Sequence, residues 1–351
     1  MLADGRKIRV LVVDDSAVMR KLISSLLEHD PEIEVVATAI DGSFAINKVD
    51  QLHPDVVTLD VDMPRVDGLT ALQEIVAKHT VPVVMLSSLT TRGARLALQA
   101  LEMGAMDFVC KPKAAAQIGE VAEELILKVK TAARSRQYAR KTGTTGYLVM
   151  PKSTRPKAGR APVRIVAIGA SSGGPNALRQ LLPKLPVDFP VPIFLVQHLP
   201  ESFTGMFAKW LDERCEIKVT ESRDGAIALP GTVTIAPGNA HLRVRKRPIG
   251  AEVTIENSRP VNGHMPSVDV LFSSVAEEYR ENGAALLMTG MGSDGSEGIG
   301  QIKRAGGYTL AQDKESCMIF GMPRVAINKG YIDQVVPLAD MASYLISAVG
   351  L

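Results

Sequence analysis

The stretch IRVLVVDDSAVMRKLISSLLE, residues 8–28, decides the fold of the first half of the chain. Its first six residues form a short apolar run, which predicts a buried strand. The residues after the two aspartates place apolar side chains on one helical face, formed by Met19, Leu22, Ile23, Leu26 and Leu27. A buried strand followed by an amphipathic helix is the repeating unit of a parallel sheet that is covered on both faces.

The same rhythm continues to about residue 127. Further strands are predicted at residues 34–39, 56–60, 81–88 and 107–110. Segments with helical spacing separate these strands and follow the last of them. We therefore predict an N-terminal α/β domain, residues 1–127, with a five-stranded parallel sheet and five helices.

Charge divides the chain into three segments. Residues 1–127 carry 12 basic and 19 acidic side chains, residues 128–160 carry 10 basic and no acidic ones, and residues 161–351 are nearly neutral. The periodic pattern gives way there to Arg, Lys, Gly, Thr and Pro, so residues 128–160 are predicted to form a basic flexible linker. Docking of this segment on an acidic surface is a second interpretation. Nucleic-acid binding is not expected, because aromatic residues are nearly absent from it.

The alternation of strands and helices resumes in the second half of the chain. Strands are predicted at residues 164–169, 192–197 and 284–289. The Val/Thr-rich segments GTVTIAPG (231–238) and EVTIENS (252–258) suggest an antiparallel excursion. We expect residues 161–351 to form a second α/β domain with a doubly wound, mostly parallel sheet.

Length and composition agree with two domains of ordinary size, since 46% of the 351 residues are hydrophobic. No apolar run approaches the roughly 20 residues that cross a bilayer, and the N-terminus lacks a signal-peptide pattern, so we expect a cytoplasmic protein without membrane insertion. Cys110, Cys215 and Cys317 are odd in number and far apart. This spacing disfavours disulfides and a zinc site, and each cysteine is expected to be a small buried residue.

Acidic side chains gather where the predicted strands of the first domain end. Asp14 and Asp15 follow the first strand, and Asp60 ends the third. The carboxyl ends of parallel strands form a ligand crevice, where three acids would repel one another unless a cation such as Mg²⁺ lay among them. Asp60 could then attack a phosphoryl donor, with Lys111 supplying a positive charge and Ser87 a hydroxyl. The alternative for any one of these acids is a solvated loop residue.

The first domain resembles a response-regulator receiver through the stretches VVDDS (12–16), TLDVDMPRVDG (58–68), VVMLSS (83–88) and FVCKP (108–112). The resemblance implies that Asp14 and Asp15 bind Mg²⁺ together with Asp60, which a histidine kinase phosphorylates. It also implies that Ser87 and Lys111 relay the change. Serine replaces the more common threonine at position 87 and keeps the hydrogen-bonding hydroxyl.

A glycine-rich turn, GASSGGP (169–175), follows a predicted strand of the second domain and opens a helix. This is the pattern of a nucleophile elbow that exposes Ser171, although a structural Gly/Ser turn or a phosphate cradle would look similar. His198 ends the next strand, in PIFLVQHLP (192–200), and Asp294 follows a third, in ALLMTGMGSDGSEG (285–298). A serine nucleophile needs a base within about 3 Å and an acid that orients this base, and these residues can supply both.

The order Ser, His, Asp departs from that of α/β-hydrolases. Residues 161–351 instead resemble the catalytic domain of the chemotaxis-specific protein-glutamate methylesterases, through IGASSGGP, QHLP, IAPGNAHL, SVDVLF and LMTGMGSDG. The resemblance implies that Ser171, His198 and Asp294 form a catalytic triad. It further implies an oxyanion-binding loop near the triad, with Met291, Ser172 and Gly173. His241 is interpreted as a structural residue, with a role in substrate placement left open.

The implied reaction removes methyl groups, as methanol, from glutamate γ-esters on the cytoplasmic helices of chemoreceptors. Receptor glutamines could be deamidated through the same acyl intermediate. The partners implied are methyl-accepting chemoreceptors and a chemotaxis histidine kinase, and the esterase half is expected to need no cofactor. The regulatory hypothesis is that the unphosphorylated receiver covers the Ser171 rim and that phosphorylation of Asp60 relieves this inhibition.

Two other functions fit parts of the sequence. The segment from Gly290 to Gly295 satisfies G-x-G-x-x-G after a strand, with Asp313 about twenty residues further on, as in dinucleotide-binding sites. This interpretation leaves Ser171 and His198 without a role. A DNA-binding output domain is the second alternative, but residues 161–351 show no basic recognition helix.

Overall fold

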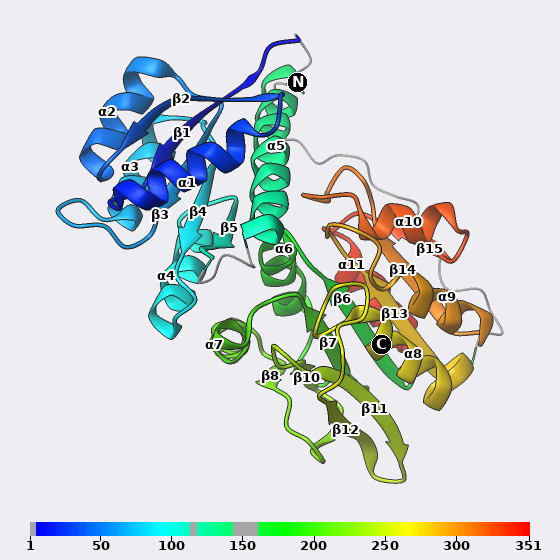
Figure 1. Ribbon diagram of the computed structural model, residues 1–351. Coiled ribbons are helices and arrows are strands. Elements are labelled where there is room, and N and C mark those ends of the chain that lie inside the picture. Colours follow the sequence, from blue (N-terminus) through cyan, green and yellow to red (C-terminus); the bar gives the residue numbers. More distant parts are fainter. Residues whose placement is uncertain (1–4, 113–117, 143–160) are drawn as a thin grey trace. The chain divides into compact units, whose positions relative to one another are not determined.

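The computed structural model describes residues 5–112, 118–142 and 161–351. The chain divides into two compact units, Met1–Val149 and Met150–Leu351, whose elements are labelled in Figure 1. Among the described helices, none has the length and apolar character that a bilayer crossing requires.

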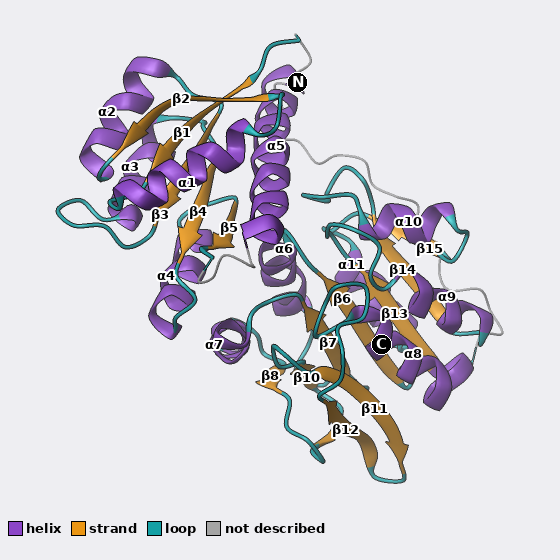
Figure 2. Cartoon of the chain, viewed as in Figure 1, coloured by secondary structure: helices purple, strands orange, loops and turns teal. Residues whose placement is uncertain are grey.

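The first unit contains a parallel sheet in the order β2-β1-β3-β4-β5, with helices on both faces (Figure 2). Its strands are β1 (Ile8–Val13), β2 (Ile33–Ala39), β3 (Val56–Asp60), β4 (Val83–Ser87) and β5 (Asp107–Cys110). Its helices are α1 (Ala17–Glu28), α2 (Gly42–Leu52), α3 (Gly68–Lys78), α4 (Thr91–Glu102) and α5 (Ile118–Thr142). The predicted five-stranded parallel fold is confirmed.

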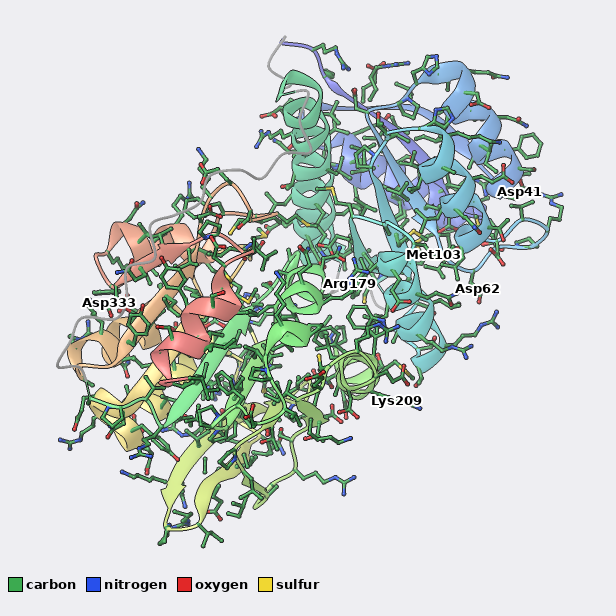
Figure 3. All side chains as sticks on the ribbon, turned by 180° about the vertical axis from the view of Figure 1, so that it is seen from behind. Asp41, Asp62, Met103, Arg179, Lys209 and Asp333 are labelled. Atoms are coloured by element: carbon green, nitrogen blue, oxygen red, sulfur yellow. The ribbon has the colours of Figure 1, made fainter. Side chains whose placement is uncertain are left out.

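Side-chain caps fix where the first four helices begin. Each capping side chain accepts a hydrogen bond from the backbone N–H three positions further on; the caps are Ser16, Asp41, Asp67 and Thr90. Asp41 is labelled in Figure 3. Such caps satisfy backbone donors that have no partner within the helix. The helices therefore start close to the carboxyl edge of the sheet, where the acidic residues lie.

Helices α1 and α5 pack together over one face of this sheet. The shared core contains apolar side chains of β1, α1 and α5; it includes Ile8, Val10, Val12, Ile23, Leu27, Leu125 and Val129. Helix α3 packs against both α2 and α4. Both faces of the sheet are thus covered, which explains why β3 and β4 are buried along their whole length.

Helix α5 corrects the predicted linker. It runs to Thr142, so residues 128–142 are helical, and the prediction that a flexible segment starts at residue 128 was wrong. Basic residues dominate the composition of this stretch, but Val129, Ala132 and Ala133 are buried in the core. Residues 143–160 lie outside the described residues, and a linker there remains a prediction.

One basic residue of this stretch is itself buried. The side chain of Lys128 is 5% exposed, and its Nζ lies 3.2 Å from Asp107 and 2.6 Å from Glu124. It also donates a hydrogen bond of 2.6 Å to the carbonyl of Phe108. Burial raises the pKa of Asp107, although Lys128 opposes this effect. The start of the predicted linker is therefore part of the core of the first unit.

The second unit contains a seven-stranded sheet in the order β15-β14-β13-β6-β7-β10-β8, and all its strand pairs are parallel. Its strands are β6 (Ile165–Ala170), β7 (Ile193–Gln197), β8 (Lys218–Glu221), β10 (Thr232–Ile235), β13 (Gly283–Leu287), β14 (Tyr308–Gln312) and β15 (Gln334–Val336). Its α-helices are α6 (Gly174–Leu181), α7 (Glu201–Asp212), α8 (Val268–Tyr279), α9 (Ser296–Arg304), α10 (Met322–Asn328) and α11 (Met341–Ala348).

A separate three-stranded antiparallel sheet contains β9 (Ile227–Ala228), β11 (His241–Arg247) and β12 (Gly250–Glu256) in the order β11-β12-β9. This confirms the antiparallel excursion at EVTIENS. The prediction for GTVTIAPG was wrong, because β10 is a parallel strand of the main sheet. Val233, Thr234 and Ile235 are all buried, and a Val/Thr-rich strand that is covered on both faces does not reveal its direction.

The main sheet has a topological switch point at its centre. From β6 the chain continues to β7 on one side, and it later returns to β13 on the other side of β6. In open α/β sheets, ligands bind in the crevice at the carboxyl ends of the strands next to such a point. This topology brings the segments after β6, β7 and β13 to one place.

No disulfide joins the three cysteines, which all lie in the described part of the chain, and each is only partly buried, so the expectation of buried residues was wrong. Cys110 ends an edge strand, whereas Cys215 and Cys317 lie in the connecting segments after α7 and β14. Burial raises the pKa of the Cys215 thiol to about 11, with a contribution from Asp212.

Candidate functional site

Ser171 lies on a tight turn between β6 and α6. Its N–H donates to the carbonyl of Thr289 at 3.0 Å, and its own carbonyl accepts from Gly174 N at 2.8 Å and from Gln197 Nε2 at 2.9 Å. Gly173 has φ +79, and a Cβ there would lie 2.6 Å from Cβ of Met318, so the turn requires glycine. The backbone around Ser171 is thus held on three sides.

The imidazole of His198 bridges Ser171 and Asp294. Its Nδ1 lies 3.1 Å from Ser171 Oγ, and its Nε2 lies 2.9 Å from Asp294 Oδ2. Because the carboxylate can only accept, Nε2 carries the hydrogen, and Nδ1 accepts from the serine hydroxyl. The predicted residues are therefore brought together in the order that general-base activation of a serine requires.

Asp294 is buried, with 1% of its surface exposed. Besides His198, it accepts hydrogen bonds from Ser267 Oγ, Val268 N, Asp269 N and Asn262 Nδ2, at 2.7, 2.7, 3.2 and 3.1 Å. Two of these donors are backbone groups at the start of α8, where the helix dipole also favours a negative charge. Burial by itself raises the pKa of Asp294, but His198 and the other donors hold this pKa well below its usual range.

Sequence reasoning missed two residues of this site. The ring of His264 stacks on that of His198, with centroids 3.9 Å apart and an angle of 16° between the planes. Asn262 donates to both Asp294 and Asp269. The dipeptide Asn262-Gly263 is a strong turn signal that could have drawn attention to this segment, but nothing in the sequence linked it to His198.

The predicted active-site loop lies beside Ser171. A Cβ on Gly290 would lie 2.7 Å from Cβ of Ser171, which places the segment before Met291 against the serine. Thr289 Oγ1 donates to the carbonyl of Ser172 at 2.9 Å and so joins the two loops. Among the described residues, no hydrogen-bond acceptor is found for the backbone N–H groups of Ser172 and Met291.

His241 is buried and has partners on both ring nitrogens. Nδ1 accepts from Ser267 N at 3.1 Å, and Nε2 lies 3.1 Å from the carbonyl of Arg259. It thereby holds the backbone of Ser267, whose hydroxyl donates to Asp294. These contacts are those of a structural residue.

The first unit has its own cluster of polar groups at the carboxyl ends of β1, β3 and β5. Ligand atoms of Asp14, Asp15 and Asp60 all lie within 4.8 Å of one another. Nζ of Lys111 lies 2.6 Å from Asp14 Oδ2 and 2.7 Å from Asp60 Oδ2. Ser87 is fully buried at the end of β4, and its carbonyl accepts from Lys111 N at 2.8 Å.

Charge in this cluster is only partly compensated, because three carboxylates lie together and Lys111 pairs with two of them, Asp14 and Asp60. Burial raises the pKa of Asp60 to about 6; Lys111 lowers it, and Asp14 raises it further. Burial lowers the pKa of Lys111, but Asp60 and Asp14 more than reverse this effect. A cluster of carboxylate oxygens with surplus negative charge suits a hard cation such as Mg²⁺.

Each of the two units matches a known protein family. Residues 10–123 match the response regulator receiver domain, and residues 166–345 match the CheB methylesterase family. The chain belongs to the CheB methylesterase family.

Relatives within this family match almost the whole chain. The protein-glutamate methylesterase/protein-glutamine glutaminase 2 of Koribacter versatilis is 47% identical over 345 residues, covering 96% of this chain and 95% of the relative. A protein of Symbiobacterium thermophilum, named protein-glutamate methylesterase/protein-glutamine glutaminase, is 44% identical and covers 98% of both chains. The crystal structure of the Thermotoga maritima CheB methylesterase catalytic domain is 40% identical, with a TM-score of 0.52, and covers 53% of this chain and 98% of that one.

The contacts of the G-x-G-x-x-G segment argue against a dinucleotide-binding site. Within the G-x-G-x-x-G segment, Gly290 packs on Ser171 and the carboxylate of Asp294 pairs with His198. Asp313, the acid that a ribose would need, accepts from N and Oγ of Ser316. These contacts account for the motif without a nucleotide.

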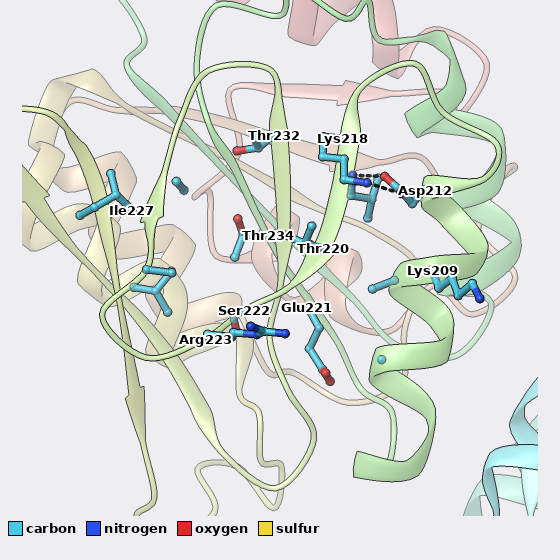
Figure 4. A pocket seen from close by; sticks show the side chains of 16 residues that line it. Lys209, Asp212, Lys218, Thr220, Glu221, Ser222, Arg223, Ile227, Thr232 and Thr234 are labelled. Carbon is cyan, nitrogen blue, oxygen red and sulfur yellow. Dashed lines mark hydrogen bonds and ion pairs between the residues drawn. The ribbon is translucent and has the colours of Figure 1, made fainter.

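A pocket beside α7 lies apart from this site (Figure 4). Its lining comes from α7, β8, β9, β10 and neighbouring segments, and includes Lys209, Asp212, Lys218, Glu221, Arg223 and Thr234. Ser171, His198 and Asp294 are not among the lining residues. Within the lining, Asp212 and Lys218 form an ion pair of 2.6 Å.

Proposed function

We propose that this chain is a phosphorylation-controlled protein-glutamate methylesterase that demethylates chemoreceptors and also deamidates receptor glutamines. The observation that carries the proposal is the chain of contacts from Ser171 Oγ through His198 to Asp294. The names of the relatives support the substrate class. A protein that acts on the cytoplasmic helices of receptors would work in the cytoplasm.

In the proposed reaction, Ser171 Oγ attacks the carbonyl carbon of a glutamate γ-methyl ester. His198 Nδ1 takes the hydroxyl proton, and Asp294 stabilises the resulting imidazolium. The tetrahedral intermediate then expels methoxide, which receives the same proton from His198 and leaves as methanol. Water attacks the acyl-enzyme, again with His198 as base, and releases glutamate and free Ser171. A glutamine substrate would follow the same path and release ammonia.

The negative charge of the tetrahedral intermediate needs donors near the carbonyl. We assign this role to the backbone N–H groups of the loops that contain Ser172, Gly173 and Met291, since these loops flank Ser171. One such donor is typically worth about 10²- to 10³-fold in rate. Every proton in this scheme moves between chain, substrate and water, so we propose that the esterase half needs no cofactor.

Asp60 is the proposed phosphorylation site of the first unit, with a chemotaxis histidine kinase as phosphodonor. Asp14, Asp15 and Asp60 would hold Mg²⁺, which neutralises charge on the phosphoryl oxygens when bound. Lys111 can leave its present ion pairs to contact the phosphoryl group, and Ser87 offers a hydroxyl from the adjacent strand. We propose that phosphorylation relieves inhibition of the catalytic unit.

The test is methanol release from a methylated receptor by the wild type and by Ser171→Ala, each with and without a small-molecule phosphodonor. We expect the substitution to lower release by at least about 10³-fold, because the acyl-enzyme cannot form. The phosphodonor should stimulate only the wild type. Release by Ser171→Ala at the wild-type rate would reject the proposed nucleophile.

A further inference from the structure

A two-residue turn between β12 and α8 touches two members of the proposed triad. Val261 and His264 exchange backbone hydrogen bonds of 3.0 Å in both directions. Between them, Asn262 and Gly263 have φ +53 and +77, the left-handed conformation that an Asn-Gly pair adopts readily. We refer to residues 261–264 as the clamp turn.

The two polar side chains of the clamp turn point to different partners. Asn262 Nδ2 donates to Asp294 Oδ1 at 3.1 Å and to Asp269 Oδ2 at 2.6 Å. The imidazole of His264 lies nearly parallel to that of His198, with centroids 3.9 Å apart. A single short turn therefore contacts both the proposed base and the acid that orients it.

We propose that the clamp turn positions the triad: His264 fixes the plane of the His198 ring, and Asn262 fixes the orientation of the Asp294 carboxylate. This proposal rests on the proposed function. Asn262 and His264 are positioning residues, since they act through His198 and Asp294.

The stacked ring restricts a torsion that is otherwise soft. Rotation of an imidazole about its last side-chain bond is broad and nearly two-fold, so packing must select one orientation. His198 has to keep Nδ1 on Ser171 and Nε2 on Asp294 at the same time. A flat ring at stacking distance opposes tilting of His198 out of this plane.

The amide of Asn262 suits the space between two carboxylates. Its nitrogen carries two hydrogens, and the two contacts are one to each acid. Asp269 also accepts from Gly298 N at 2.7 Å, and burial raises the pKa of Asp269, with a further contribution from Asp294. Without the amide, the two acids would face each other without this bridge, and Asp294 would lose one of the donors that hold Oδ1.

The test follows labelling of Ser171 by a fluorophosphonate probe in the full-length chain. This reaction needs an activated serine but no methylated receptor. We expect His264→Ala and Asn262→Gly to slow labelling about 10- to 100-fold, the typical cost of a misplaced catalytic group. Glycine at position 262 removes the amide and tolerates the positive φ. His264→Phe keeps a flat ring and should stay within about threefold of the wild type.

Asn239→Gly provides the matched control, because glycine again removes the amide and tolerates the positive φ. Asn239 also has a positive φ, +61, and its amide also donates to a carboxylate, Glu201 at 3.1 Å; no hydrogen bond to a member of the triad is found for it within the described part of the chain. We expect it to label at the wild-type rate. A thermal melt of each variant separates loss of positioning from loss of folding, and turnover of methylated receptor should show a lower kcat with little change in KM.

The outcomes distinguish the two proposals. If the wild type and Ser171→Ala label equally, Ser171 is not the activated nucleophile, and the proposed function fails. If the wild type labels and Ser171→Ala does not, but folded His264→Ala and Asn262→Gly react like the wild type, only the clamp turn is rejected. Equal slowing in His264→Phe and His264→Ala would also reject positioning by the stacked ring.

Discussion

The polar clusters of the two units lie at equivalent points of parallel sheets, but the surroundings of a buried aspartate shift its pKa in opposite directions. Asp60 pairs with Lys111 and accepts a long hydrogen bond from Asp62 N at 3.4 Å. Asp294 accepts from His198 and four further donors. Burial accordingly raises the pKa of Asp60 to about 6, whereas the donors hold that of Asp294 well below its usual range.

The difference follows from what each carboxylate has to do. A group that binds a cation and accepts a phosphoryl group needs free lone pairs, so it cannot be saturated with hydrogen bonds. A group that orients an imidazole works best when it is saturated, since each donor removes a way for it to rotate or to become protonated. The same strand-end position thus supports an unsaturated site in one unit and a saturated site in the other.

The largest effect should come from breaking the saturated site. Asp294→Asn places an amide where His198 Nε2 needs an acceptor that carries charge, and we expect kcat to fall about 10³- to 10⁴-fold. Methanol release from methylated receptor measures it. Asp212→Asn is the comparison variant, because Asp212 is also a carboxylate of the second unit that accepts a backbone hydrogen bond, from Val219 N, and its ion pair is with Lys218. An Asp294→Asn enzyme with near-normal kcat would remove Asp294 from the triad.

Removal of the unsaturated carboxylate should leave basal turnover intact. Asp60→Asn cannot accept a phosphoryl group, so stimulation by the phosphodonor should disappear while activity without donor stays at the wild-type level. Allosteric coupling of about 1–3 kcal/mol corresponds to roughly 5- to 150-fold stimulation. The ratio of rates with and without donor reports it, and stimulation that survives in Asp60→Asn would point to another phosphorylation site.

Removal of divalent cations should abolish stimulation by the phosphodonor and leave the basal esterase rate unchanged. With EDTA present, the phosphodonor should stimulate the wild type no more than it stimulates Asp60→Asn, and added Mg²⁺ should restore the effect. The rate without donor serves as the internal control and is expected to stay constant. A fall in this basal rate on chelation, reversed by Mg²⁺, would contradict a cofactor-free esterase.

The smallest expected effect is on stability, where the two aspartate substitutions should change the free energy of unfolding in opposite directions. The pKa of Asp60 is raised in the folded state, so its ionisation costs stability at pH 7, and this cost is relieved as the pH falls through about 6. Asp60→Asn should therefore stabilise the first unit at pH 7, by roughly 1–3 kcal/mol in EDTA. The pKa of Asp294 is lowered, so its contribution is present above about pH 4 and lost below it.

Asp294→Asn should accordingly destabilise the second unit at pH 7, by a similar roughly 1–3 kcal/mol. Denaturant unfolding of the two full-length variants at pH 7 and pH 5 measures both effects. At pH 5 the gain from Asp60→Asn should shrink, whereas the loss from Asp294→Asn should remain. Equal signs at pH 7 would show that the contrast between the two carboxylates is wrong.

Prediction from sequence succeeded where hydrophobic periodicity identifies a strand and where the end of a strand locates a residue. The strands at residues 8–13, 56–60 and 107–110 have the predicted bounds. Ser171, His198 and Asp294 could be placed near one another because parallel strands end at a common edge. Strand direction at β10 and the length of α5 could not be predicted, because they depend on which faces the rest of the fold covers.

The contacts of the clamp turn could not be predicted from the sequence for a different reason. His264 and Asn262 act across contacts with partners that are distant along the chain, and no periodic pattern encodes a stacked pair of rings. The orientation of His198, with Nδ1 toward the serine, is likewise set by packing. Residue types and strand ends predict which residues lie close together. Side-chain packing determines which of their atoms are in contact.

The burial of Lys128 sets the minimal length of an autonomous receiver. A fragment that stops at residue 127 would keep Asp107 inside the protein after its cation has been cut away. Removal of one partner of a buried ion pair costs about 3–5 kcal/mol, which is a large share of the 5–15 kcal/mol that typically stabilises a domain. The excised fragment should fold robustly only when its C-terminus lies beyond Ala133, so that the last turns of apolar contact are retained as well.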